Sequence, residues 1–449
     1  GGAGVRPHKN SINNYCYPEN PEAGIDLFLE KLVQETEKEH EDILEQADET
    51  DAMFGELYSW YLRNPEYRSR VQKLVQSAFA EKPEDIISQS VAKALYGEVS
   101  PYSATRLERF AACAFAHFLQ YGMKLTERVE YEFKPMDMGN VMHEALESFA
   151  EEVRKRGMKW TELTEQERNE IADRCLDNIV ADYGNTVLKS SARNEYMIER
   201  TRRILRRTVW ALQKQLEQGE FQPEGFEVTF GGGRIDRVDI MEDQNKVYVK
   251  VIDYKTGNTS FDLVYLYHGL QLQLMIYLDG ALRVEQKKYP DKEIIPAGVF
   301  YYNIKDPMIQ EKIDADVEAV SAGLMKELKM NGLVQADPEL VYRMDSSLGS
   351  IPVAFNKDGS FRKNSSVADR TQFAVLGRYV RTKIEKIRSS ILEGDAEVSP
   401  YELGKKNACT YCPYMTVCGF DRRLSGYEFR RLKNFSDEEL WKAFDREAE

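Results

Sequence analysis

A run of β-branched and aromatic residues, Lys246-Val-Tyr-Val-Lys-Val-Ile-Asp-Tyr-Lys255, ends in an acidic and a basic side chain. Such a run predicts a strand in the interior of a sheet. Asp253 and Lys255 are two residues apart, so both side chains leave the same face of that strand. A carboxylate and an ammonium group at the end of a buried strand are costly unless something binds there. We therefore expect a functional site at this position.

The surrounding pattern predicts the fold class. Two strands, at residues 226–230 and 234–240, precede the buried strand, and a polar turn is expected at 242–245. A helix is expected over 264–282 and a further strand over 298–303. Three meandering strands, a helix and another strand indicate an α/β fold with a central mixed β-sheet flanked by helices.

The rest of the chain divides into three expected parts. Residues 1–95 form a helical segment without a catalytic motif, 96–425 form the main domain, and 426–449 form a helical tail. Residues 352–361 are expected to form a hairpin around an Asn-Lys-Asp-Gly turn.

Helical patterns fill the first half of the main domain. Ser103 or Thr105 is expected to cap a helix that runs through Phe118. Gly139 is expected to open the next helix, and helical spacing then continues over residues 164–216.

The charge balance is informative mainly in its distribution. A net charge of −14 argues at first against nucleic acid, but acidic residues crowd into 35–51. Two basic clusters lie elsewhere, and each is commonly no more than a solvated helix face. We expect the first to form one basic face that contacts DNA phosphates; it comprises Arg202, Arg203, Arg206 and Arg207, and the second comprises Arg422, Arg423, Arg430, Arg431 and Lys433.

Nothing in the sequence predicts a membrane protein. The most apolar stretch, 263–282, is interrupted by His268, Gln271, Gln273 and Asp279, which suits a buried helix better than a bilayer span. The first residues lack the apolar core of a signal peptide. We expect a cytoplasmic protein without membrane contact.

Four more side chains are expected at the end of the buried strand. Asp236 lies on the preceding strand, 17 residues before Asp253, and can reach the same site. Its rival Asp239 is three residues further on and should face the opposite side. His143 lies on the helix that Gly139 is expected to open, and Gln273 and Tyr277 share one face of the helix that follows the buried strand.

This set suits metal-assisted hydrolysis of a phosphodiester. Asp236 and Asp253 would be carboxylate ligands of Mg²⁺ or Mn²⁺. His143 could add a nitrogen ligand and the Tyr254 carbonyl a further oxygen. Lys255 would orient the attacking water or stabilise the transition state. Each motif alone has a plain structural explanation, but their ordered combination favours a catalytic site.

The ordered motifs resemble the RecB-like branch of the PD-(D/E)XK nucleases. More narrowly, they resemble the nuclease region of the AddB family, which belongs to the bacterial AddAB helicase–nucleases. The resemblance covers about residues 96–425 and rests on Tyr102-Ser-Ala-Thr-Arg-Leu-Glu-Arg-Phe-Ala-Ala-Cys, Gly233-Arg-Ile-Asp-Arg-Val-Asp, Val251-Ile-Asp-Tyr-Lys-Thr-Gly, Tyr267-His-Gly-Leu-Gln-Leu-Gln-Leu and Ile304-Lys-Asp-Pro.

The resemblance implies a PD-(D/E)XK nuclease fold with a site at His143, Asp236, Asp253 and Lys255. It also implies an exonuclease that acts on the 5′-terminated strand during double-strand-break processing, in a heterodimer with an AddA-like helicase–nuclease. The alternative is a module of the same fold that binds DNA without cutting it. The intact acidic pair and lysine favour the enzyme. No Gly-x₄-Gly-Lys-Ser/Thr loop occurs, so no ATP-driven motor is expected in these residues.

The cysteines predict a metal centre. Cys409, Cys412 and Cys418 are clustered, and Cys113 is the best candidate for a fourth ligand, 296 residues before Cys409. The spacing alone suits zinc as well as an iron–sulfur cluster. The resemblance implies a [4Fe–4S] cluster on these four residues. The remaining cysteines, Cys16 and Cys175, are expected only to pack.

Overall fold

The structure, a computed structural model, describes residues 49–78, 86–97, 103–126, 135–182, 191–231, 233–309, 316–423 and 426–448. Two compact units make up the chain. The first combines Gly1–Asp85, Glu397–Pro400 and Tyr414–Arg430, and the second holds the remainder. The N-terminal segment of the first unit thus reaches Asp85, whereas the sequence-based boundary was residue 95. Most of the acidic run over 35–51 lies outside the described residues.

The first unit contains three described helices, α3 (Glu49–Arg63), α4 (Pro65–Ala78) and α16 (Met415–Cys418). Leu57, Tyr61 and Val71 are buried between α3 and α4. The helical character expected for the N-terminal segment is present there.

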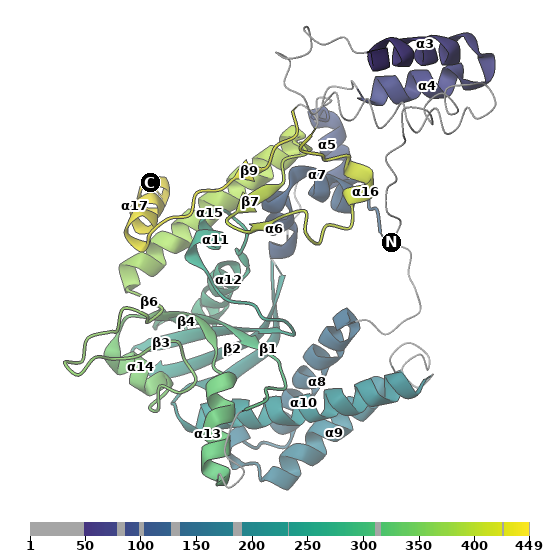
Figure 1. Ribbon diagram of the computed structural model, residues 1–449. Coiled ribbons are helices and arrows are strands. Elements are labelled where there is room, and N and C mark those ends of the chain that lie inside the picture. The colour runs from purple at the N-terminus through teal and green to yellow at the C-terminus, as the bar shows by residue number, and fades with distance from the viewer. Residues whose placement is uncertain are drawn as a thin grey trace. The chain divides into compact units, whose positions relative to one another are not determined.

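A six-stranded mixed sheet is the centre of the second unit (Figure 1). Its strand order follows the sequence from β1 to β6. The pairs β1/β2, β2/β3 and β4/β5 are antiparallel, whereas β3/β4 and β5/β6 are parallel. The strands are β1 (Gln222–Phe230), β2 (Gly233–Asp243), β3 (Lys246–Lys255), β4 (Glu293–Asn303), β5 (Asn331–Gln335) and β6 (Val367–Ala368).

Helices cover both faces of this sheet, and each face has its own hydrophobic core. Side chains of α8 (Pro135–Lys155), α9 (Glu165–Asp182) and α10 (Ala192–Glu217) join Ile252 and Tyr254 in the first core. The second core lies on the other face and includes Val249 and Val251, with α6 (Ala104–Ala112), α12 (Gln273–Lys288) and α15 (Arg370–Glu393). The α/β class with a helix-flanked mixed sheet is therefore confirmed.

Shorter elements complete the second unit. The tail helix α17 packs on α15, and β7 and β8 form a small antiparallel hairpin. Phe355 and Phe361 pair across the expected hairpin turn. The elements are α5 (Gln89–Tyr96), α7 (Ala114–His117), η1 (Phe118–Gly122), η2 (Trp160–Glu162), α11 (Leu263–Tyr267), α13 (Val317–Glu327), α14 (Pro338–Met344), β7 (Tyr401–Leu403), β8 (Lys406–Asn407), β9 (Arg430–Arg431) and α17 (Asp437–Ala448).

Several helix boundaries differ from the sequence-based expectation. The helix expected over 264–282 is two helices, α11 and α12, because Gly269 adopts a left-handed backbone (φ 78°). The helix from Ser103 is interrupted at Cys113 and continues past Phe118 as a π-helix. α8 begins at Pro135, before Gly139, because proline suits the first turn of a helix. Among the described helices, none is long and apolar enough to cross a membrane.

Candidate active site

The C-terminal end of β3 carries the acidic and basic side chains that mark the predicted site. Val249, Val251 and Ile252 are fully buried, so the strand is anchored on both faces. Asp253 is buried as well, and its Oδ2 lies 2.6 Å from Lys255 Nζ. Both charged groups therefore share one face, as the alternation predicted.

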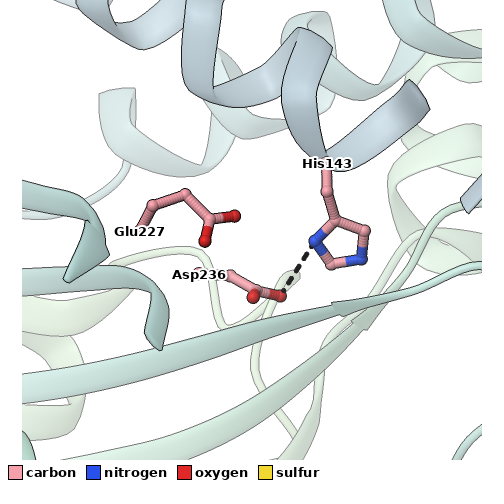
Figure 2. Close-up of side chains that lie close together, drawn as sticks. All are labelled: His143, Glu227 and Asp236. Atoms are coloured by element: carbon pink, nitrogen blue, oxygen red, sulfur yellow. Dashed lines mark ion pairs between the residues drawn. The ribbon is translucent and has the colours of Figure 1, made fainter. Parts of the chain in front are cut away.

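Asp236 reaches the same place from β2. Its Oδ2 accepts a 2.7 Å hydrogen bond from the Tyr254 main-chain N–H and lies 3.3 Å from His143 Nδ1. Figure 2 shows His143 descending from a helix, α8, onto the carboxylate of Asp236. The expected members from α8, β2 and β3 are thus brought together.

Glu227 on β1 is a member of the site that sequence reasoning missed. One carboxylate oxygen of Glu227, one of Asp236 and a ring nitrogen of His143 all lie within 4.8 Å of one another (Figure 2). Glu227 adopts a left-handed backbone (φ 49°), an unusual conformation for a residue other than glycine. Its side chain is 8% exposed and pairs with Arg234. The only signal in the sequence is an acidic residue inside an apolar strand.

The electrostatics of this cluster favour a cation. Burial and the neighbouring Asp253 charge raise the pKa of Asp236 well above its usual value. Burial likewise raises the pKa values of Asp253 and Glu227. Burial and the nearby Lys255 lower the pKa of His143 to about 4, so its imidazole is neutral at pH 7. Crowded carboxylates beside a neutral imidazole are a donor set that suits a hard divalent cation, because the cation relieves their repulsion.

Lys255 is held from the second core by α12. Its Nζ donates to Gln273 Oε1 at 2.8 Å, and Gln273 Nε2 donates to the Tyr277 hydroxyl at 2.9 Å. Burial raises the pKa of Tyr277 to about 12, so the phenol stays protonated. The expected pair on this helix therefore forms a chain that ends on the lysine.

Glu108 on α6 supports that chain and was also missed. Its Oε1 accepts hydrogen bonds from the main-chain N–H groups of Leu272 (2.7 Å) and Gln273 (2.9 Å), at the first turn of α12. Burial raises its pKa to about 7, against the opposing effect of these hydrogen bonds and of Lys255. Contact between α6 and α12 spans more than 160 residues of sequence, so local periodicity could not reveal it.

Asp239 lies elsewhere, as the alternation indicated. It is fully buried and pairs with Arg237 Nε (2.6 Å) and Lys250 Nζ (3.0 Å). The guanidinium of Arg237 packs over the Trp160 and Phe226 rings, in the first core. Asp239 is therefore neutralised by protein cations, whereas Asp236 faces the carboxylates of the site.

The four clustered arginines of α10 all line one groove, and they divide into two pairs by their carboxylate partners. Arg202 and Arg206 turn toward α9, where both pair with Asp173. Arg203 and Arg207 instead share Asp306, at 2.7 and 3.7 Å. The two pairs are offset because residues one apart on a helix point about 100° away from each other.

Three of the four predicted cysteine ligands belong to the second unit. Cys113 is buried at the C-terminal cap of α6, and Arg109 on the same helix donates to Cys412 Sγ at 3.8 Å. Asn407 Oδ1 accepts from the main-chain N–H of Cys409. Cys418 ends α16 in the first unit, where the Phe420 N–H donates to its Sγ at 3.5 Å. Cys175 is buried in the first core, and Cys16 lies outside the described residues.

The sequence and this geometry agree with a known family. A model of the PD-(D/E)XK nuclease superfamily matches residues 101–419. The chain belongs to that superfamily.

Curated relatives share one description: each is the B-type subunit of an ATP-dependent helicase/deoxyribonuclease. The relative from Lachnoclostridium phytofermentans is 41% identical over 425 residues. Those from Thermoanaerobacter sp. and Clostridium acetobutylicum are 34% and 33% identical. In each comparison the match covers 89% of this chain but 36 or 37% of the relative. The chain thus spans little more than a third of the length of these relatives.

Proposed function

We propose that this chain is a nuclease that hydrolyses DNA phosphodiesters with a divalent metal, Mg²⁺ or Mn²⁺. The observation that carries the proposal is the meeting of Asp236, Asp253 and Lys255 at the end of β3. Buried carboxylates with raised pKa values are common at functional sites. Membership of a nuclease superfamily supports the same chemistry.

Each side chain has a distinct part in this proposal. Asp236, Asp253, His143 and the Tyr254 carbonyl would hold the metal, and Glu227 is placed to assist them. The metal would lower the pKa of a bound water and offset charge on the phosphate. Lys255, held by Gln273 and Tyr277, would donate to the attacking water or to a phosphate oxygen.

The decisive test is Asp253→Ala, assayed on single-stranded DNA with Mg²⁺ and with EDTA. We expect wild-type cleavage that EDTA stops, and a loss of at least about 10³-fold in the variant, because a buried metal ligand is removed. DNA binding should persist. Asp243→Ala, at the exposed end of β2, is the matched control and should cleave normally. Cleavage by the Asp253 variant at the wild-type rate would refute the site, and a wild type that only binds would indicate a silent DNA-binding module.

We further propose that the chain acts within a larger helicase–nuclease. Relatives described as components of a helicase/deoxyribonuclease support this assignment, because the chain matches about a third of their length. An AddA-like protein would be its partner, and the 5′-terminated strand at a double-strand break would be its substrate. A [4Fe–4S] cluster on Cys113, Cys409, Cys412 and Cys418 would be its second metal centre. The approach of Cys412 to α6, which ends at Cys113, supports a shared ligand set.

A further inference from the structure

One side of α10 carries an alternation of aromatic and arginine side chains that the proposed chemistry does not use. Tyr196, Arg200, Arg203, Arg207 and Trp210 follow one another at intervals of four and three residues, so they form one strip along the helix. All five line a groove of 590 Å³, together with Arg202 and Arg206 of the same helix and Ser321 and Leu324 of α13. At about 1.5 Å per residue, the strip is about 21 Å long.

The two ends of the strip offer rings to a ligand. Tyr196 is 64% exposed, one of the most exposed aromatic side chains among the described residues. Trp210 is partly buried at the other end of the groove. An exposed tyrosine on the surface of a helix adds little to folding, but its face can stack on an unpaired base.

The arginines of the strip outnumber the carboxylates that pair with them, so the strip keeps a net positive charge. Arg203 and Arg207 share the single carboxylate of Asp306, and Arg200 makes no ion pair within the described part of the chain. Two carboxylates line the groove itself; Glu199 pairs with Arg202, and Glu165 lies near enough to Arg168 to influence its charge. Three arginines thus face one acidic group.

Asp306 ties this strip to the active site. It follows β4 by three residues, and the intervening Ile304 N–H donates to the Lys255 carbonyl at 2.7 Å. Two arginines of the strip are therefore paired with the segment that leaves the catalytic end of the sheet.

We propose that the strip formed by Tyr196, Arg200, Arg203, Arg207 and Trp210 binds single-stranded DNA. The arginines hold successive phosphates, and the rings stack on bases. Duplex DNA fits less well because its bases are stacked on one another and cannot cover a tyrosine face. This inference rests on the proposed nuclease function and adds the place where the substrate strand is held.

The test is the affinity of the full chain for fluorescent oligo(dT) in EDTA, where no cleavage occurs. Tyr196→Ala should weaken binding about 5- to 100-fold, the usual effect of losing a stacked base. Arg200→Gln should weaken it too, and should lower the slope of log K against log salt by about 0.7, the value for one phosphate of a single strand.

Arg283→Gln, at an exposed position of α12 outside the groove, is the matched control. Its guanidinium pairs with Asp279, which keeps Arg381 as a partner after the substitution. The control should bind oligo(dT) within about twofold of wild type, and Tyr196→Ala should bind a blunt duplex within the same margin. Equal losses in Arg283→Gln and Arg200→Gln, or an equal loss on the duplex, would overturn the proposal.

The outcome is separable from that of the nuclease proposal. Normal binding by both strip variants in a chain that cleaves would refute the strip and leave the nuclease intact. Lost binding in a chain whose wild type never cleaves would support the strip and refute the nuclease.

Discussion

Glu108 illustrates how a single half-buried carboxylate can position a residue of the site through main-chain hydrogen bonds. It accepts hydrogen bonds from the main-chain N–H groups of Leu272 and Gln273 at the start of α12. These bonds position Gln273, which accepts a hydrogen bond from Lys255. Negative charge at a helix N-terminus is favourable, because the helix dipole is positive there. Burial outweighs this effect and raises the pKa of Glu108 to about 7.

A pH-dependent stability follows from that pKa. The folded value of about 7 exceeds the ordinary 4.5, so the stabilisation linked to this proton is full below pH 4.5 and is lost as the pH rises through 7. Glu108→Gln should abolish this dependence, because glutamine can still accept both hydrogen bonds. Urea unfolding at pH 4.5 and pH 8 measures this dependence. Between these two pH values, the free energy of unfolding of wild type should fall by about 3 kcal/mol relative to that of the variant. If the free energies of unfolding of wild type and variant differ by the same amount at both pH values, the pKa of Glu108 is not raised by folding.

The alternation of side chains along strands correctly predicted which face several site residues occupy. Where this rule missed a residue, the cause is physical. Asp253 and Lys255 were placed on one face, and Asp236 was separated from Asp239, because the period of a strand is strictly two. Glu227 sits on β1 with a left-handed backbone, where that period is disturbed. Glu108 acts through a partner 165 residues away, and no local pattern encodes such a contact.

Among the helices, α15 shows that two glycines of one helix can differ in their effect on stability. Gly394 terminates the helix with a left-handed backbone (φ 94°), and a Cβ there would lie 1.9 Å from the Ile87 carbonyl oxygen. Gly377 lies within the helix, where a Cβ would meet only the end of the flexible Arg381 side chain, at 3.8 Å.

Alanine substitutions at these two glycines should therefore differ in sign. Gly394→Ala should lower the free energy of unfolding by about 1–3 kcal/mol, through backbone strain and the clash. Gly377→Ala should raise it by up to about 1 kcal/mol, because alanine has the higher helix propensity. Urea denaturation of both variants provides the measurement. Equal shifts in the two would show that α15 does not end as described.

The presence of helices and strands could be predicted where the apolar residues follow a strong period. The residues at which these elements begin and end could not. The strands over 226–230, 234–240, 246–255 and 298–303 are all present, most of them longer than expected. The helix expected over 264–282 failed because the apolar pattern continues across Gly269, although the backbone turns there. The stabilising contact at that break, from Glu108 to α12, comes from a distant helix.

For the whole molecule, the fold class was predictable but the division into units was not. The order of strands and helices along the chain indicated a mixed sheet with helices, and the family match agrees. The first unit, in contrast, takes Glu397–Pro400 and Tyr414–Arg430 from the far end of the chain. Such an assembly depends on long-range packing, which composition and periodicity do not report.

The proposed cluster makes a prediction at this scale. Chain purified without oxygen should contain iron and absorb visible light, and Cys113→Ser should lose both and melt at a lower temperature, because metal binding is coupled to folding. Cys175→Ser is the matched control: this buried cysteine packs in the first core and should keep the iron. A colourless, well-folded protein with stoichiometric zinc would contradict the iron–sulfur assignment.

The spread of the site along the chain has a consequence for biosynthesis. Glu108 emerges from the ribosome before His143, Asp236 and Asp253, and its acceptor helix α12 comes later still. Helix α15, which closes the second core over α6, is made more than a hundred residues after the catalytic strand. Because contacts of such high sequence separation form late in folding, a nascent chain lacks an assembled site. Translation itself thus delays assembly of the proposed site until most of the second unit has been synthesised.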